Sequence, residues 1–345
     1  MEEGLALTGE LWTRHWHLLC HRSELSASRA FARFDILGAE VVAFNDGGSV
    51  VVFDNRCPHR GARIFVEDHG ARRFVCPYHG WSFANGRVFV GNKEAFAHCD
   101  LSGLDLRRLR IEWLGDFLFV SWDPAASLLD QLGGVADIVE RISYSIDRRT
   151  DYNAYAYECD WRIGLENALE PYHVSMIHPE SLGTLDLQRG RNEYFGRNSI
   201  WFSEVGAERT SRRLKSLGRM FDLGYQFEGY MSIYMFPFTM ISSTFGYSYS
   251  LQNFFPSATA ERTHFYSRLL TSRLREGVKP ELLESFFESS AALNRQTFDE
   301  DHVICKRVPL DSWSEATPRV WSQDEEKLVH FRQSYAAFRA ERAGS

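Results

Sequence analysis

Features that would place this chain in several common functional classes are missing from its sequence. Its start, Met1 to Gly4, lacks the basic stretch and apolar run of a signal peptide. The longest apolar stretch, at about residues 230 to 241, is too short and too interrupted to span a bilayer. A net charge of −7 argues against nucleic acid as a partner. We therefore expect a soluble, cytoplasmic protein that binds neither a membrane nor nucleic acid.

Cysteine and glycine are not used for scaffolding either. The six cysteines do not form a disulfide framework. No glycine-rich loop for nucleotide phosphates is present, nor any repeat or low-complexity segment. The 345 residues are instead 44% hydrophobic and 14% aromatic, enough for two domains with large cores. Four cysteines show no ligand spacing and are expected to be buried and inert: Cys20, Cys99, Cys159 and Cys305.

Two short segments each place one cysteine beside one histidine. They are Cys57-Pro-His59 and Cys76-Pro-Tyr-His79, with sixteen residues between His59 and Cys76. In a Rieske [2Fe–2S] cluster, two thiolates hold one iron and two imidazoles hold the other. Neutral imidazoles make such a cluster easier to reduce than an all-cysteine one. We predict that these four residues bind a Rieske cluster and that the chain carries an electron.

A structural zinc site is the alternative interpretation, because zinc also accepts two Cys and two His. Zinc motifs usually separate the cysteine pair from the histidine pair, whereas here each loop supplies one of each. The stretches from Asp54 to Gly61 and from Cys76 to Trp81 resemble the Rieske domains of ring-hydroxylating oxygenases. Ligand chemistry and flanking residues together favour the Rieske cluster.

A second group of candidate ligands lies between Glu166 and Pro179. His173 and His178 are five residues apart and would lie roughly 140° apart on a straight helix. Pro171 disfavours helical geometry at Glu170, and Pro179 follows His178 directly. A kinked segment can therefore direct both imidazoles at one metal. Two histidines and one carboxylate form the facial triad of non-haem Fe(II) oxygenases, which leaves positions open for O₂ and substrate.

The carboxylate of the triad has to come from elsewhere in the chain. A helical stretch that opens at Lys279-Pro280 ends in Asp299-Glu300-Asp301. The run from Glu300 to Val308 is similar to the segment that carries the ligand aspartate of Rieske oxygenases. This similarity selects Asp301, with Asp299 and Glu300 as alternatives. The competing interpretation is a solvated acidic helix face.

The segment from Glu166 to His178 resembles the catalytic domain of the same family, so the resemblance covers both metal sites and most of the chain. It implies that a carboxylate three residues before the first histidine ligand bridges a Rieske histidine to the iron-bound histidine across a subunit boundary. Here the position holds Glu170, one methylene longer than the family's usual Asp, and the bridged pair is His79 and His173. The other interpretation of Glu170 is a helix-terminal acid that stabilises the following turn.

The expected fold class is α+β. We expect a lead-in over residues 1–33 that packs on the catalytic domain, a small all-β Rieske domain over 34–123, and a catalytic mononuclear iron domain over 124–345. Hairpins are predicted around Asn45-Asp46-Gly47-Gly48 and Leu114-Gly115-Asp116. For the catalytic domain the resemblance implies a helix-grip fold, an antiparallel sheet with helices against it.

Aromatic residues are dense between residues 225 and 256. A wall of such side chains suits a flat, apolar substrate near the iron, although ordinary sheet core is the simpler interpretation for each residue. Aromatic faces also bind cations, which leaves a quaternary ammonium substrate open. The nine residues are Tyr230, Tyr234, Phe236, Phe238, Phe245, Tyr247, Tyr249, Phe254 and Phe255.

The resemblance implies a terminal oxygenase component that forms a homotrimer. A separate reductase, directly or through a ferredoxin, supplies electrons to the cluster. They pass to the mononuclear Fe(II), which activates O₂ to hydroxylate or dihydroxylate an apolar, aromatic small molecule. One alternative is a monooxygenase or demethylase acting on a quaternary ammonium or other amine. Another is a non-catalytic Rieske electron carrier, against which the roughly two hundred residues beyond Asp123 argue.

Overall fold

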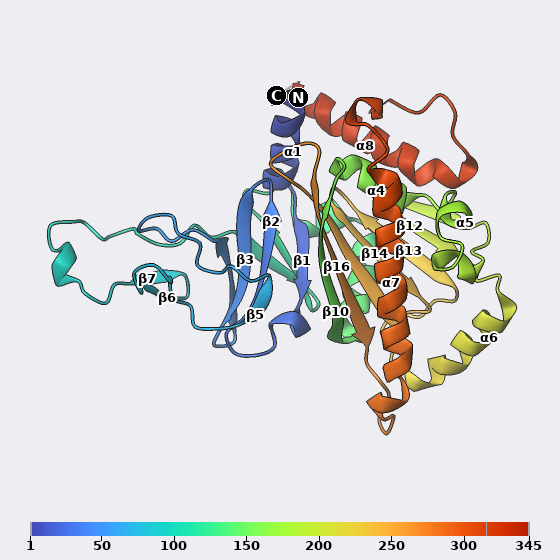
Figure 1. Cartoon of the computed structure of the whole chain (residues 1–345), viewed down its shortest axis with the longest axis horizontal. Coiled ribbons are helices and arrows are strands. Elements are labelled where there is room, and N and C mark those ends of the chain that lie inside the picture. Colours follow the sequence, from blue (N-terminus) through green and yellow to red (C-terminus); the bar gives the residue numbers. More distant parts are fainter. Residues whose placement is uncertain (1, 315, 344–345) are drawn as a thin grey trace.

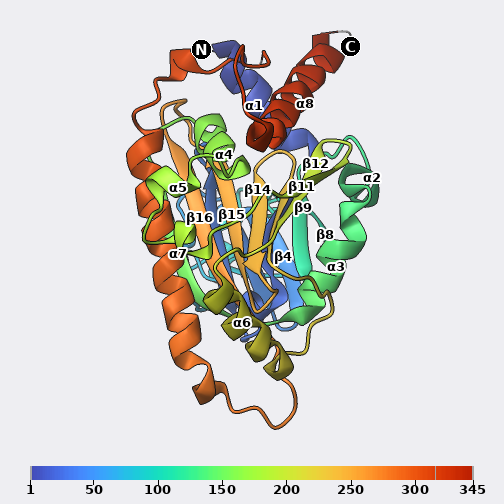
Figure 2. The same cartoon turned by 90° about the vertical axis from the view of Figure 1, so that its right-hand side faces the viewer.

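A seven-stranded antiparallel sheet forms the middle layer of the molecule (Figures 1 and 2). The computed structural model describes residues 2–314 and 316–343. The strand order is β10-β16-β15-β14-β13-β12-β11. The strands are β10 (Ile146–Tyr157), β11 (Arg191–Phe195), β12 (Asn198–Ser203), β13 (Tyr230–Met235), β14 (Thr239–Thr244), β15 (Ser248–Pro256) and β16 (Thr263–Ser272).

Helices surround one face of this sheet, and the smaller sheets lie behind the other. Figure 2 shows α4 and α5 near the top of the front face, α6 near the bottom and α7 along the side. The α-helices of the described residues are α1 (Glu2–Arg14), α2 (Leu128–Leu132), α3 (Val135–Ser145), α4 (Trp161–Leu169), α5 (Val174–Ile177), α6 (Glu208–Leu217), α7 (Glu284–Cys305) and α8 (Glu326–Ala343). None of them is long and apolar enough to cross a membrane.

Three smaller sheets build the β lobe on the left of Figure 1. Their orders are β1-β9-β8, β4-β3-β2-β5 and β6-β7. The strands are β1 (His17–His21), β2 (Ala30–Ile36), β3 (Ala39–Asp46), β4 (Ser49–Asp54), β5 (His69–Ala71), β6 (Ser82–Ala84), β7 (Arg87–Phe89), β8 (Arg110–Leu114) and β9 (Phe117–Ser121).

Both predicted hairpins are present. β3 and β4 are joined by Gly47 and Gly48, whose φ angles of +66° and +103° suit a primed two-residue turn that only glycine adopts easily. β8 and β9 are joined by Gly115 and Asp116. Local turn chemistry therefore determined these two pairings.

Of the two expected domain boundaries, one falls inside a strand and the other falls between two elements. The limit between residues 33 and 34 falls inside β2, and the lead-in contributes β1, which pairs with β9. The limit after Asp123 falls between β9 and α2. The three-part division stays a prediction.

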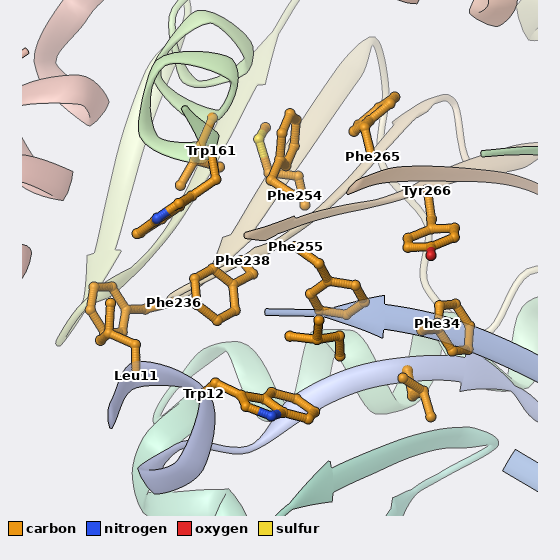
Figure 3. Close-up of a cluster of buried hydrophobic side chains, with 14 of the residues drawn as sticks. Leu11, Trp12, Phe34, Trp161, Phe236, Phe238, Phe254, Phe255, Phe265 and Tyr266 are labelled. Atoms are coloured by element: carbon orange, nitrogen blue, oxygen red, sulfur yellow. The ribbon is translucent and has the colours of Figure 1, made fainter. Parts of the chain in front are cut away.

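A buried aromatic cluster joins the β lobe to the large sheet (Figure 3). The ring of Phe255 on β15 lies 6.4 Å from that of Trp12 on α1 and 6.2 Å from that of Phe34 on β2. Burying each such side chain contributes roughly 1.5–3 kcal/mol. The lobe that carries the Cys/His loops is thus packed firmly against the sheet.

Candidate metal centres and the cavity beside them

The two Cys/His loops have the same backbone construction. In each, the N–H four residues after the cysteine donates to the cysteine carbonyl, at 2.8 Å for Cys57 and 3.1 Å for Cys76. Each cysteine N–H donates in turn to the carbonyl five residues later, at 2.9 and 2.8 Å. Gly61 and Gly80 occupy the fourth position, and both have φ of +71°, a conformation that favours glycine. The loops therefore present their cysteines in equivalent ways, and each places its histidine two or three residues further on.

The side chains of these loops converge. Cys57 and Cys76 are buried, and the rings of His59 and His79 are 4.6 Å apart. His59 stacks on Trp81 at 4.5 Å, and its buried Nδ1 has no hydrogen-bond partner among the described residues. Burial and the neighbouring Cys76 raise the pKa of the Cys57 thiol. A buried ring nitrogen without a partner is costly unless a metal takes its lone pair, and the two thiols of the neighbouring loops supply the other ligand type, so these residues fit a [2Fe–2S] cluster.

The predicted kink between the two distant histidines is present. α4 ends at Leu169, and Glu170, before Pro171, is extended, with φ of −117° and ψ of 142°. The short helix α5 then lies between His173 and His178, which flank its two ends. Their Nε2 atoms are 3.2 Å apart, as a shared metal site requires.

Asp301, buried on α7, completes this group. Its Oδ1 lies 3.0 Å from His178 Nε2 and 3.5 Å from His173 Nε2. In residues 2–314 and 316–343, only these three residues form a cluster of His, Cys, Asp or Glu ligand atoms within 4.8 Å of one another. The alternative Asp299 is exposed. Burial lowers the pKa of His173, but hydrogen bonds to Asp301 and Glu170 outweigh burial and raise it to about 9.

Without a metal, protons on the imidazoles of His173 and His178 face the buried carboxylate of Asp301. A divalent metal replaces these protons on binding. The structure therefore brings His173, His178 and Asp301 together in an arrangement that fits a mononuclear iron.

Further carboxylates orient both imidazoles. Glu170 Oε1 accepts a hydrogen bond from Nδ1 of His173 at 2.7 Å, and Glu300 Oε2 accepts one from Nδ1 of His178 at 2.8 Å. Because each hydrogen bond is made at Nδ1, the Nε2 atom of each histidine is free to face the metal. Glu300, considered from the sequence only as a rival ligand, thus contacts the far side of His178.

Sequence reasoning missed Asn167. Its Nδ2 donates to Asp301 Oδ1 at 2.6 Å and holds that carboxylate in place. The available signal was its position three residues before Glu170, on the last turn of α4. Asp160 caps α4 by accepting a hydrogen bond from the N–H of Arg162.

The expectation for the remaining cysteines is wrong at one position. Cys20, Cys159 and Cys305 are buried, but Cys99 is exposed because it follows the 3-10 helix at Glu94–Phe96 in an exposed loop before β8.

A cavity of about 470 Å³ is lined by the three clustered residues and by α6, α7 and the large sheet. Of the nine aromatic residues expected as its wall, Tyr230 lines it. The other eight belong to buried core clusters, so the simpler interpretation holds for them. Strands β13 to β15 instead contribute mainly hydroxyl and amide groups to the lining: Ser232, Ser242, Ser243, Thr244, Ser248, Ser250 and Gln252.

Comparisons with known proteins identify the class to which this fold and these sites belong. Residues 15–96 match the Rieske [2Fe-2S] domain, and residues 137–341 match the ring hydroxylating alpha subunit (catalytic domain). The chain belongs to the ring-hydroxylating alpha subunit family. The predicted α+β fold and the two predicted cofactors, a Rieske cluster and a mononuclear iron, are confirmed at this level. Which residues hold them stays a prediction.

Individual relatives differ in what they act on. The carnitine monooxygenase oxygenase subunit of Escherichia coli (strain K12) is 26% identical over 248 residues, which are 68% of this chain and 62% of that protein. The anthranilate 1,2-dioxygenase large subunit of Acinetobacter baylyi is 28% identical over 57% of this chain and 45% of its own length. This chain thus matches less than two thirds of these curated relatives.

Solved structures share the fold over nearly the whole chain. A quaternary ammonium Rieske monooxygenase with a bound inhibitor has a TM-score of 0.75 at 17% identity, covering 96% of this chain and 91% of that one. Naphthalene 1,2-dioxygenase with indole bound has a TM-score of 0.72 at 18% identity, covering 97% and 89%.

Proposed function

We propose that this chain is the terminal oxygenase component of a Rieske non-haem iron system. The observation that carries the proposal is the convergence of His173, His178 and Asp301 on a cavity large enough for a small molecule. A protein that only carried electrons would need neither this group of two histidines and an aspartate nor this cavity.

The residues have separate roles in this proposal. The cluster is held by Cys57, His59, Cys76 and His79, and the iron by the three clustered residues. When bound, the cluster supplies electrons, and the iron, whose triad leaves positions open, activates O₂. Glu170 and Glu300 hold the protons on the far nitrogens of the two histidines. The cavity walls hold the substrate beside the iron.

A separate reductase, directly or through a ferredoxin, would supply electrons to the cluster held by the four Cys and His residues, and within a homotrimer that cluster would serve the iron held by a neighbouring chain. Figure 1 places β6 and β7, next to the second Cys/His loop, and α5, next to His173, at opposite ends of the long axis. Glu170 then lies between His173 of its own chain and His79 of the neighbour. We place the protein in the cytoplasm, whose reducing conditions suit two cluster ligands and four further cysteines that form no disulfide.

The proposal allows two classes of substrate. Relatives named for aromatic acids favour an aromatic substrate. The alternative is a quaternary ammonium or other amine: relatives are named for carnitine and glycine betaine, and the rings of Trp201 and Tyr230, both on the cavity wall, are 5.8 Å apart and able to hold a cation.

Iron content and product formation test the proposal. We expect about three iron atoms per chain, two in the cluster and one in the triad, and oxygenated product when the reduced protein meets O₂ and a substrate. About two iron atoms per chain, with no loss of iron in His173→Ala, would favour the electron carrier.

A further inference from the structure

The charges on the cavity wall are unevenly distributed. Its two carboxylates, Glu170 and Asp301, both belong to the metal site. Among the described lining residues, Arg213 of α6 is the one Arg or Lys. Its exposed side chain has no ion-pair partner among residues 2–314 and 316–343. The cavity therefore carries a cation whose charge the described residues leave unpaired.

The helix that carries Arg213 is itself cationic. Between Glu208 and Leu217 it holds Arg209, Arg212, Arg213 and Lys215 against one acid, Glu208, so four positive charges and one negative give +3. The chain as a whole has a net charge of −7. A local positive field beside a cavity raises the local concentration of anions and their rate of entry.

Two of the other three basic side chains of α6 are paired. Arg212 lies 3.8 Å from Glu208, and Lys215 lies 2.7 Å from Glu228. Neither Arg212 nor Lys215 lines the cavity. Arg213 is thus distinguished from these two by both its position and its lack of a partner.

A second polar group on the wall also lacks a partner. The amide Nδ2 of Asn294 is buried, has no hydrogen-bond partner among the described residues and lies on the cavity-lining face of α7. Asn294 is two turns before Asp301 on the same helix, about 10 Å along its axis. A buried amide N–H without a partner is costly unless a ligand accepts from it.

From these observations we propose that the cavity takes a small molecule bearing a carboxylate, with the carboxylate bound by Arg213 and an oxygen of the substrate accepting a hydrogen bond from Asn294. The proposal deepens the proposed function, because it treats the cavity as the substrate site. An aromatic acid and a betaine share this carboxylate chemistry. A purely cationic amine does not, since Arg213 repels it.

Binding to the protein loaded with cluster and iron, measured by anaerobic titration calorimetry, tests the proposal. The probes are anthranilate and γ-butyrobetaine, each compared with its neutralised methyl ester. We expect a carboxylate to bind at least about tenfold more tightly than its ester, and Arg213→Gln to remove most of that preference. Arg213→Lys keeps the charge but loses the paired N–H groups, and is expected to be intermediate. The probe that binds, anthranilate or γ-butyrobetaine, shows whether the substrate is an aromatic acid or a betaine.

Arg212→Gln is the matched control, because it removes an equal charge from the same helix without touching the cavity. Equal effects of Arg212→Gln and Arg213→Gln, equal binding of acids and esters, or binding of neither acid would overturn the proposal. Product formation with O₂ is read separately. If an ester is oxidised in preference to its acid, the oxygenase function is supported and the carboxylate site is contradicted. If the acids bind but are not oxidised, only the oxygenase function is contradicted.

Discussion

At the scale of single residues, three consecutive acids at the end of α7 have three different surroundings. The carboxylate of Asp301 is buried and contacts both histidines, that of Glu300 contacts His178 and Ser181, and that of Asp299 is exposed. One-residue steps on a helix rotate a side chain by roughly 100°, which is why neighbouring acids can have different roles.

Isosteric amides at these three positions separate the roles. We expect Asp301→Asn to lose the mononuclear iron and all product formation, because an open triad cannot lose a ligand and hold Fe(II) firmly. Glu300→Gln should weaken iron retention about 10- to 100-fold, as an orienting partner does. Asp299→Asn should change neither. Iron content is measured while the visible spectrum of the Rieske cluster reports that the fold is intact. Full activity in Asp301→Asn with loss in Asp299→Asn would show that the third ligand is Asp299.

Lys327 is a buried amine on α8 whose Nζ donates to Ser232 Oγ at 3.0 Å. Burial lowers its pKa from 10.5 to about 7. Below pH 7 both the folded and the unfolded chain hold this proton, so the group adds no pH dependence. Between about pH 7 and 10.5 the unfolded chain holds a proton that the folded chain lacks, so stability rises with pH.

We therefore expect Lys327→Met to raise the thermal midpoint at pH 7 and to remove a slope of up to about 1.4 kcal/mol per pH unit above it. Burial lowers the pKa of the nearby His330 from its ordinary value of 6.5. His330 therefore titrates below the range from pH 7 to 10.5 and does not supply the slope. Thermal unfolding of both proteins from pH 6 to 10 measures the effect. Identical slopes would mean that Lys327 keeps its proton in the folded protein.

At the scale of elements, the position of α4 depends on a buried ion pair with α8. Arg332 donates to both oxygens of Glu166 at 2.7 and 2.8 Å, and Trp313 Nε1 donates to the same carboxylate at 2.9 Å. α4 also carries Asn167 and ends just before Glu170. The pair therefore fixes the helix that leads into the metal site.

Removing one partner of this pair is expected to be costly. Arg332→Met leaves the carboxylate of Glu166 buried without its main cation, and we expect a loss of about 3–5 kcal/mol in stability. The double variant Glu166→Gln with Arg332→Met should recover part of that loss, since no unpaired charge remains. Denaturant unfolding of the single and double variants gives the coupling. Strictly additive losses would show that the two side chains act independently.

What the sequence could predict at this scale was local. Pro171 and the turn at Gly47-Gly48 act on their immediate neighbours, so the kink and the hairpin followed from short-range sterics. The contact of Asn167 with Asp301 spans 134 positions and depends on how α4 packs on α7. Nor could strand alternation tell which face of a sheet lines a cavity: β15 is buried on both faces, and its aromatic residues turned out to lie in the core.

At the scale of the whole molecule, the separation of the two sites makes assembly part of the proposed function. The Tyr78-His79 end of the second Cys/His loop is exposed, and so are Tyr172 and Met176 beside the iron site, at 65% and 80%. A head-to-tail contact that closes into a ring would cover both surfaces at once. Glu170, already bound to His173, would then meet His79 of the next chain.

Mixing inactive chains tests this arrangement directly. Cys57→Ser loses the cluster, His173→Ala loses the iron, and each is expected to be inactive alone. In a mixed ring, some contacts pair the intact cluster of one chain with the intact iron of its neighbour, so we expect part of the activity to return when the two are co-expressed. Adding Glu170→Gln to the chain that keeps its iron should abolish that return even when excess Fe(II) keeps the triad occupied, because the residue orients a ligand rather than binding the metal and its loss, like that of Glu300, weakens iron retention only about 10- to 100-fold. The same substitution in the chain that already lacks iron is the control and should change little, since its Glu170 faces an empty triad. No recovery in mixed rings, or a fully active monomer at working concentration, would require an electron route within one chain.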